Sequence, residues 1–189
     1  MDGRLSKADF DTIFAFYKSP LGARMTALEN ARITAGAEAP MGKAGELLEE
    51  LKNKPERGEV LKLMESSLQL TESSTDRAFN MARAVAIGMA AADEKTTALP
   101  ADAIQAIDSA MQQMRPAMMA QVKERVWLSL AYTYRDASVS ELRQYLAFLT
   151  SSGGKKLYGS IVPAMNKVLI KAGGEFGHAL MRELGKENI

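Results

Sequence analysis

The stretch that decides the fold is Ser6–Gly22, SKADFDTIFAFYKSPLG, which recurs in altered form as Ser138–Gly154, SVSELRQYLAFLTSSGG. Each copy begins with a serine that is followed three positions later by an acidic residue, the spacing of a helix-starting capping box. Apolar residues at helical spacing follow in both copies: Phe10, Ile13, Phe14 and Tyr17, and then Leu142, Tyr145, Leu146 and Leu149. A further serine ends this helix and begins the next one. The pattern predicts two copies of a helix–turn–helix repeat, over about residues 6–34 and 138–170.

The rest of the chain also has the periodicity of amphipathic helices, and no segment shows the alternation of a β-strand. Prolines and glycines set the expected breaks. A helix should begin at Ser73, where an aspartate three residues later repeats the capping spacing. Pro116 should separate two helices, and Pro163 should bend the last long helix. Two consecutive glycines, Gly173 and Gly174, should interrupt that last helix.

These patterns predict an all-α protein, a multi-helix bundle. Its length of 189 residues suits one domain, or two small halves that share a core. We therefore expect residues 1–189 to form a single helical domain with an internal repeat.

Composition excludes several classes of protein. The chain has a formal net charge of +1 and no cysteine. So small a charge creates no field that would attract nucleic acid, and we expect no nucleic-acid partner. The absence of cysteine excludes disulfides and thiolate metal sites. No stretch approaches the roughly 18 apolar residues of a membrane span, and the first residues lack the apolar run of a signal peptide.

Reactive groups are scarce in the sequence. His178 is the sole histidine, and it lies about one helical turn from Glu175 and Arg182, as is typical of a solvated helix face. The sequence contains no metalloprotease, P-loop or dinucleotide-binding motif. It therefore identifies no catalytic residue, no cofactor site and no metal site.

The turn of the second copy has features of an anion site. The candidate residues are Ser151, Gly153, Gly154, Lys155 and Lys156. A helix N-terminus presents free amides, and two glycines with two lysines would let a phosphate, sulfate or carboxylate approach them. The alternative is a plain glycine turn whose lysines are solvated.

Methionine and aromatic residues concentrate in the second half of the chain. The candidate lining of an apolar groove is Met114, Met118, Trp127, Tyr134, Tyr145 and Phe148. Methionine lines adaptable binding surfaces, so the groove would accept a partner helix or a hydrophobic small ligand. Core packing is the alternative explanation for the same residues.

The two copies resemble a bacterial family of domains of unknown function, number two thousand and fifty-nine. The first copy carries the resemblance in Ala15–Gly22, AFYKSPLG, and the second in Leu142–Leu157, LRQYLAFLTSSGGKKL. The second copy departs from the family pattern at Leu149, where tyrosine is usual, and at Ser152, where proline is usual. The resemblance implies an all-helical protein that is exported to the periplasm, whereas the sequence without it suggests the cytoplasm. It transfers no catalytic residue.

The functional expectation follows from these features. We expect a non-enzymatic binding or protein-interaction module with an apolar groove, whose partner is a second copy of the chain, another protein or a hydrophobic small molecule. The alternative is a hydrolase-like enzyme whose site is assembled from scattered polar residues and is not recognisable from sequence.

Overall fold

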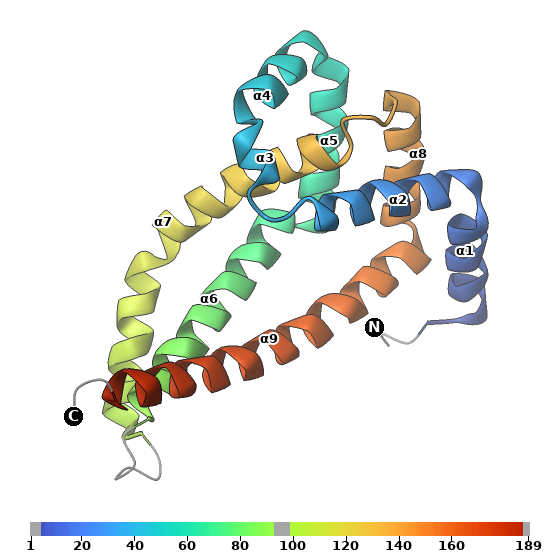
Figure 1. Ribbon diagram of the computed structural model, residues 1–189. Helices are drawn as coiled ribbons and strands as arrows, with labels where there is room; N and C mark the ends of the chain where they lie inside the picture. Colours follow the sequence, from blue (N-terminus) through green and yellow to red (C-terminus); the bar gives the residue numbers. More distant parts are fainter. Residues whose placement is uncertain (1–4, 93–98, 187–189) are drawn as a thin grey trace. The chain divides into compact units, whose positions relative to one another are not determined.

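The computed structural model describes residues 5–92 and 99–186. Within these ranges the chain forms nine helices and no strand, which confirms the all-α prediction (Figure 1). The helices are α1 (Lys7–Lys18), α2 (Pro20–Thr34), α3 (Ala39–Gly42), α4 (Ala44–Asn53), α5 (Pro55–Leu68), α6 (Leu70–Ala90), α7 (Ala101–Thr133), α8 (Val139–Thr150) and α9 (Ser152–Lys186).

Both predicted capping boxes are present. The Ser6 side chain accepts a hydrogen bond from the Asp9 amide, and the Asp9 carboxylate accepts one from the Ser6 amide. Ser138 and Glu141 make the same reciprocal pair at the start of α8. Each pair satisfies two amides that would otherwise lack partners at a helix N-terminus, and this explains why the two helices begin at these residues.

The two turns that follow are also alike. Ser19 has φ −76° and ψ 156°, and Ser151 has φ −65° and ψ 163°, so each serine leaves the helical region for one residue. The hydroxyl oxygen of each serine then accepts a hydrogen bond from a glycine amide, Gly22 at 3.0 Å and Gly154 at 3.1 Å. These are local features of the two segments, and the duplication of a whole repeat over 6–34 and 138–170 stays a prediction.

The apolar stripes of the two copies differ in burial. In α8, Leu142 and Leu149 are fully buried. In α1, by contrast, Phe10 and Phe14 are 45% and 58% exposed. The inward contacts of α1 come from Ile13 of the stripe and from Phe16, which both pack against the core. The Phe16 ring stacks on Phe148 with 3.8 Å between the centroids.

Two expected helix boundaries are wrong. The helix expected to begin at Ser73 begins three residues earlier as α6, because Gln69 has the left-handed φ of 49° and separates α5 from α6. Helix α7 continues through Pro116, where two separate helices were expected. Helix α9 includes Pro163, where the expected bend stays a prediction. Both prolines are exposed, so each removes one helical hydrogen bond at a position where water solvates the freed carbonyl.

The expected interruption at Gly173-Gly174 is also wrong, because α9 is continuous there. A Cβ added to Gly173 would lie 3.1 Å from the carbonyl oxygen of Met81 in α6. One added to Gly177 would lie 2.2 Å from the carbonyl oxygen of Val85. The glycines of α9 therefore allow close approach to α6, and tertiary packing compensates for their low helix propensity.

The helices form two compact units. Unit 1 comprises Met1–Thr71 and Val122–Ser160, and unit 2 comprises Glu72–Gln121 and Ile161–Ile189. Helices α7 and α9 contribute residues to both units. The expected organisation as one domain over residues 1–189 stays a prediction.

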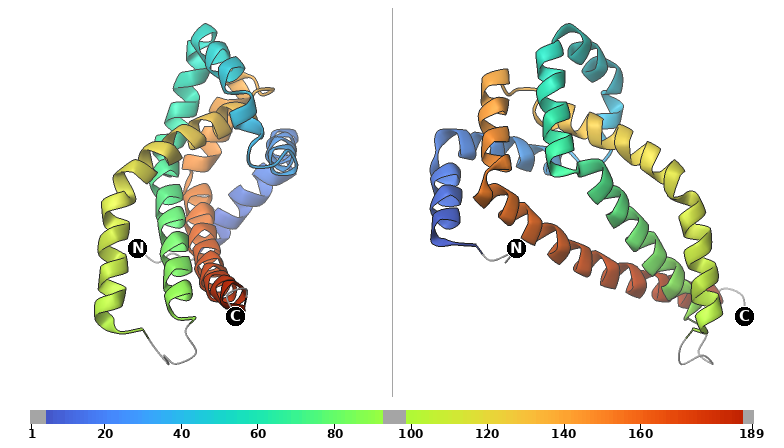
Figure 2. Two further views of the ribbon diagram at one scale, coloured as in Figure 1. Left: turned by 60° about the vertical axis from the view of Figure 1, so that its left-hand side comes forward. Right: turned by 180° about the vertical axis from the view of Figure 1, so that it is seen from behind.

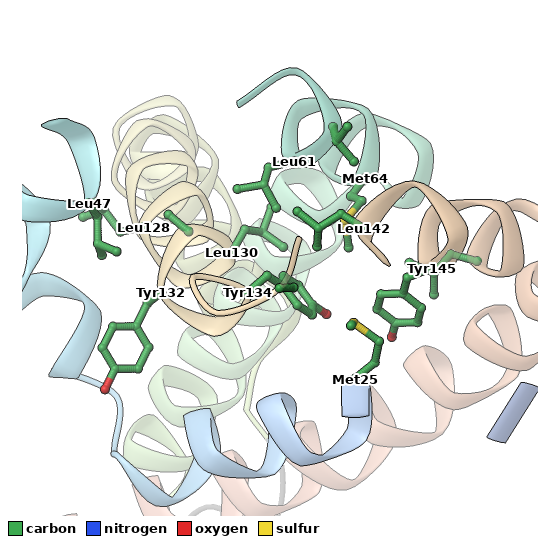
Figure 3. Close-up of a cluster of buried hydrophobic side chains, with 14 of the residues drawn as sticks. Met25, Leu47, Leu61, Met64, Leu128, Leu130, Tyr132, Tyr134, Leu142 and Tyr145 are labelled. Atoms are coloured by element: carbon green, nitrogen blue, oxygen red, sulfur yellow. The ribbon is translucent and has the colours of Figure 1, made fainter. Parts of the chain in front are cut away.

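Unit 1 holds the large hydrophobic core. Its most deeply buried apolar side chains come from α2, α5, α7 and α8: Met25, Val60, Leu61, Met64, Leu128, Leu142 and Leu149. In the close-up of this core, Met25 lies between the rings of Tyr134 and Tyr145, while Tyr132 points away from them (Figure 3). Residues near the start of the chain, such as Met25, thus share one core with residues as distant in sequence as Leu149.

Unit 2 is built from α6, the first part of α7 and most of α9, which lie side by side in both views of Figure 2. Two ion pairs join α6 to α7: Arg83 with Asp108, and Asp76 with Arg115. The partners are seven residues apart on each helix and in opposite order, so this pair of helices is antiparallel. The Arg115 guanidinium also lies 5.3 Å from the centroid of the Phe79 ring.

Candidate interaction surface

A group of polar side chains lies within unit 1, around Glu29 of α2. The hydroxyls of Tyr134 and Tyr145 both donate to Glu29 Oε1, at 2.8 Å and 2.6 Å. The Tyr145 hydroxyl also lies 3.0 Å from that of Tyr158. This group, which we call the Glu29 cluster, joins α2, the end of α7, α8 and the start of α9.

The phenols of the Glu29 cluster stay protonated at neutral pH. Burial is the main cause that raises the pKa of Tyr134, Tyr145 and Tyr158 above the ordinary value, and the nearby Glu29 carboxylate raises all three further. At neutral pH these hydroxyls therefore donate hydrogen bonds and cannot act as phenolate bases. The cluster was not predicted from sequence, since Glu29 lies 105 positions from Tyr134.

The predicted anion site meets a carboxylate of the same chain. The Ser152 hydroxyl donates to Asp9 Oδ1 at 2.7 Å, and Lys156 Nζ donates to Asp9 Oδ2 at 2.6 Å. Asp9 is only 4% exposed. Gly153 is buried beside it, where an added Cβ would lie 2.9 Å from the Asp9 carbonyl oxygen, while Lys155 is exposed.

Several hydrogen-bond donors at the predicted anion site are already bonded within the chain. The Gly154 amide donates to Ser151 Oγ, and Ser152 and Lys156 both bind Asp9. Asp9 therefore completes the capping box of α1 and also holds α1 against the start of α9. Binding of a free anion at this turn stays a prediction.

Asp9 should make the stability of the fold depend on pH. The hydrogen bond from Lys156, followed by those from Ser6, holds the pKa of Asp9 well below its ordinary value of 3.8. A carboxylate whose pKa is lower in the folded state than in the unfolded state stabilises the fold at any pH above its unfolded-state pKa. This stabilisation is lost as the pH falls from the unfolded-state pKa towards the folded-state pKa. We expect Asp9→Asn to lower the melting temperature at neutral pH and to flatten its decline below pH 4, as measured by circular dichroism.

Asp11→Asn is the matched control for this prediction. Asp11 lies in the same helix and pairs with Lys7 at 2.9 Å, but its side chain is largely exposed. Its replacement should leave both the neutral-pH stability and the acid limb close to wild type. Equal acid limbs for wild type and Asp9→Asn would contradict the assigned role of Asp9.

The six residues predicted to line one groove divide between the units. Four belong to unit 1 and two to unit 2: Trp127, Tyr134, Tyr145 and Phe148, and then Met114 and Met118. Tyr134, Tyr145 and Phe148 are part of the buried core, and Trp127 packs against it. Met114 is 59% exposed on α7. A groove formed by all six stays a prediction, and their placement fits the alternative of core packing for the unit 1 members.

Of the sixteen large apolar side chains that are exposed among the described residues, seven lie in unit 1 and nine in unit 2. The nine in unit 2, which we call the unit 2 apolar surface, are Met81, Met114, Ile161, Met165, Val168, Ile170, Phe176, Met181 and Leu184. Among the described residues of unit 2, Phe79 is the one large apolar side chain that is buried. Large apolar areas on a protein surface commonly mark interaction sites.

Most of this surface lies on α9, and sequence reasoning missed its pattern. Six exposed residues there, which we call the α9 stripe, are Ile161, Met165, Val168, Ala172, Phe176 and Ala179. They follow one another at intervals of three or four residues, so they share one face of the helix. The signal was present in the sequence, but the expected break at positions 173 and 174 divided the stripe in two.

The described part of the chain contains neither a candidate metal site nor a helix that could span a membrane. Across residues 5–92 and 99–186, no three histidine, aspartate or glutamate side chains form a group that could hold a metal ion. His178 is exposed on α9. The described helices also include none with the length and apolar character that a membrane span requires.

Comparison with known proteins gives one match. A family model described as "Uncharacterized protein conserved in bacteria (DUF2059)" matches residues 3–50, which confirms the resemblance inferred from the first copy. The match covers the first helix–turn–helix copy, whereas the second copy lies outside the matched residues. No curated protein and no solved structure matches the chain.

Proposed function

We propose that this protein is a non-enzymatic helical interaction module, in which unit 1 is the folded scaffold and unit 2 provides the binding surface. The observation that carries the proposal is the contrast in burial between the units. Unit 1 buries Met25, Leu61, Leu142 and their neighbours and exposes seven large apolar side chains. The described part of unit 2 buries one large apolar side chain, Phe79, and exposes nine. Covering such a surface with a partner contributes about 25 cal/mol for each Å² of apolar area removed from water.

The chemistry of this surface favours an apolar helix of another polypeptide as the partner. Four of its nine members are methionines, namely Met81, Met114, Met165 and Met181. Methionine has a flexible, polarisable side chain that repacks around partners of different shape. The exposed members of α9 follow a helical spacing, and a second helix packs its own ridges against such a row.

A fluorescent apolar probe tests the proposal. We expect 1-anilinonaphthalene-8-sulfonate to bind the native protein at neutral pH with a strong rise in emission, because the unit 2 apolar surface is open to it. The double change Met81→Gln and Met114→Gln should reduce that emission by about half, since glutamine keeps the side-chain length but is polar. Far-ultraviolet circular dichroism should confirm that the variant keeps its helices.

Met41→Gln is the matched control. Met41 lies on α3 in unit 1 and is exposed to a similar degree as Met81. Its replacement should leave the emission unchanged. An emission that is absent in the native protein, or that falls equally in the control, would contradict a binding role for unit 2.

We also propose that the protein acts in the periplasm, which is what the family resemblance implies. Cell fractionation of the bacterium that encodes the chain, with an antibody against unit 1, tests this. Recovery with periplasmic markers is expected, and recovery with cytoplasmic markers would overturn the assignment.

A further inference from the structure

We propose that the exposed methionines of unit 2 are a modification site for peroxides, and that their oxidation to methionine sulfoxide switches off binding at the unit 2 apolar surface while the core of unit 1 stays intact. The inference rests on the proposed function, because it names a regulation of the same surface. Three observations carry it: the concentration of methionine in unit 2, the exposure of these side chains, and the burial of the core methionines of unit 1.

Unit 2 uses methionine where unit 1 uses leucine. Unit 1 has sixteen leucines and four methionines, whereas unit 2 has four leucines and eight methionines. The eight come from all three helices of unit 2: Met81, Met89, Met111, Met114, Met118, Met119, Met165 and Met181. Leucine and methionine replace each other with little effect on packing. The preference for methionine therefore adds a property that packing does not require, an oxidisable sulfur.

The methionines of unit 2 are open to small solutes. The exposed ones are Met81, Met114, Met165 and Met181, at 41%, 59%, 49% and 37%. The other four are half-buried, and none of the eight is fully buried. Oxidation of a methionine follows its exposure, so a peroxide reaches the four exposed side chains first.

The core methionines of unit 1 are protected. Met25 and Met64 are each 1% exposed. Their sulfurs become reachable only when the core opens, and a protein of ordinary stability is open for about one part in a thousand or less of the time. Oxidation of the exposed methionines therefore leaves the core of unit 1 unmodified.

The reaction is a two-electron oxygen transfer. A lone pair of the thioether sulfur attacks one oxygen of the peroxide, so that the O–O bond breaks and an S–O bond forms. With hydrogen peroxide, the proton of the transferred hydroxyl passes to the leaving hydroxide, and the products are methionine sulfoxide and one water. The sulfur is oxidised and the peroxide is reduced. Because the chain contains no cysteine, no thiolate of the protein competes for the oxidant.

Oxidation changes the surface from apolar to polar. The sulfoxide oxygen accepts hydrogen bonds from water, and an apolar partner would displace that water without replacing the bonds. Four of the nine members of the unit 2 apolar surface would carry such an oxygen. Its members on α6 and α7 are methionines alone, Met81 and Met114, so oxidation removes the apolar character of the surface on both helices.

Peptide mass spectrometry after treatment with hydrogen peroxide at pH 7 tests the modification site. Met114 should gain an oxygen first, since it is the most exposed of the described methionines. Met25 and Met64 should react at least about a hundredfold more slowly, because their oxidation waits for opening of the core. Oxidation of Met25 or Met64 as fast as that of Met114 overturns the proposal.

The emission of 1-anilinonaphthalene-8-sulfonate tests the switch. Peroxide is removed with catalase once the four exposed methionines of unit 2 carry oxygen. The emission should then be about half that of the untreated protein or less, while far-ultraviolet circular dichroism keeps its helical signal. Methionine sulfoxide reductases of both stereospecificities should restore the emission. Emission that stays at the untreated level, or that the reductases do not restore, overturns the switch.

A leucine variant links the effect to these four sulfurs. It combines Met81→Leu, Met114→Leu, Met165→Leu and Met181→Leu, which keep the apolar area and remove the oxidisable atoms. Its emission should equal that of the wild type and should not fall after peroxide. Met41→Leu is the control, since Met41 is 37% exposed in unit 1, and this variant should lose emission as the wild type does. An equal loss in the combined variant overturns the assignment to these methionines.

The untreated protein separates failure of the switch from failure of the proposed function. Emission that is present before peroxide and unchanged after it overturns the switch and leaves the interaction module standing. A protein without emission before treatment overturns both the module and the switch.

Discussion

Replacing Gly154 by alanine should destabilise the protein by about 2–3 kcal/mol, although alanine is the better helix former. A Cβ at this position would lie 2.2 Å from the carbonyl oxygen of Phe148 and 2.9 Å from that of Leu149. Both obstacles are main chain, so the turn between α8 and α9 has to move to accept the methyl group. Urea unfolding followed by circular dichroism would measure the free energy of unfolding.

The same change at Gly22 should have a similar effect. Its added Cβ would lie 2.1 Å from the carbonyl oxygen of Phe16, so the first turn is as closely packed as the second. In both turns the glycine amide binds the hydroxyl of the serine three residues earlier. The predicted repeat requires that Gly22→Ala and Gly154→Ala lower the free energy of unfolding by similar amounts. In both turns the main chain leaves no room for a Cβ at the glycine.

Gly159→Ala provides the control for both changes. Gly159 lies in α9, is exposed, and has no atom within 4 Å of an added Cβ. Its replacement should be neutral or stabilise the protein by up to about 1 kcal/mol, through helix propensity alone. If Gly154→Ala and Gly159→Ala have the same stability, the steric explanation of the turns is wrong.

The parts of the fold that could be predicted from sequence are those decided by neighbouring residues. The capping boxes at Ser6 and Ser138, and the turns at Ser19 and Ser151, depend on partners three positions away, and all four were predictable. Expected breaks failed where distant contacts decide the outcome. Pro116 lies inside a continuous helix because tertiary packing holds α7 along its length, and one lost hydrogen bond does not end it.

Burial of the repeated stripe was not predictable for a related reason. Phe10 and Leu142 occupy equivalent positions in the two copies, yet the phenylalanine is exposed and the leucine is fully buried. Helix periodicity identifies an apolar face, but the neighbouring helices determine whether it is covered. The same holds for the candidate sites: Lys156 is 147 positions from Asp9, and no local pattern links them.

The second large effect is expected at Arg57, a buried cation that closes the end of α7. Its guanidinium donates from Nη1 to the carbonyl oxygen of Tyr134 at 2.7 Å and from Nη2 to that of Ala137 at 2.6 Å. The side chain is 8% exposed, and its Nε lies 3.9 Å from Glu50 Oε1. Both carbonyls belong to the turn that follows α7, and Arg57 donates to them out of contact with water. The Tyr134 carbonyl also accepts a hydrogen bond from the Ala137 amide at 3.0 Å.

Arg57→Ala should therefore destabilise the protein by about 3–5 kcal/mol, because it removes two charge-assisted hydrogen bonds to buried carbonyls and takes from the Ala137 carbonyl its guanidinium donor. For a chain of this length that corresponds to a fall in Tm of roughly 10 °C. Arg57→Lys should recover only part of the loss, since one ammonium group cannot donate to both oxygens with the geometry of a planar guanidinium. Differential scanning calorimetry of the wild type, Arg57→Lys and Arg57→Ala would measure Tm, which should fall in that order.

Arg24→Ala separates burial from hydrogen bonding as the source of this effect. Arg24 also donates to a main-chain oxygen in the turn after α7, that of Asp136 at 2.7 Å, and pairs with Glu141, but its side chain is 50% exposed. Water can replace the lost donor at an exposed site, so the expected cost is below about 1 kcal/mol. If Arg24→Ala and Arg57→Ala lower the free energy of unfolding equally, burial is not the reason for the large contribution of Arg57 to stability. A large difference would instead identify Arg57 as the residue that fixes the end of α7, and with it the placement of Tyr134 in the Glu29 cluster.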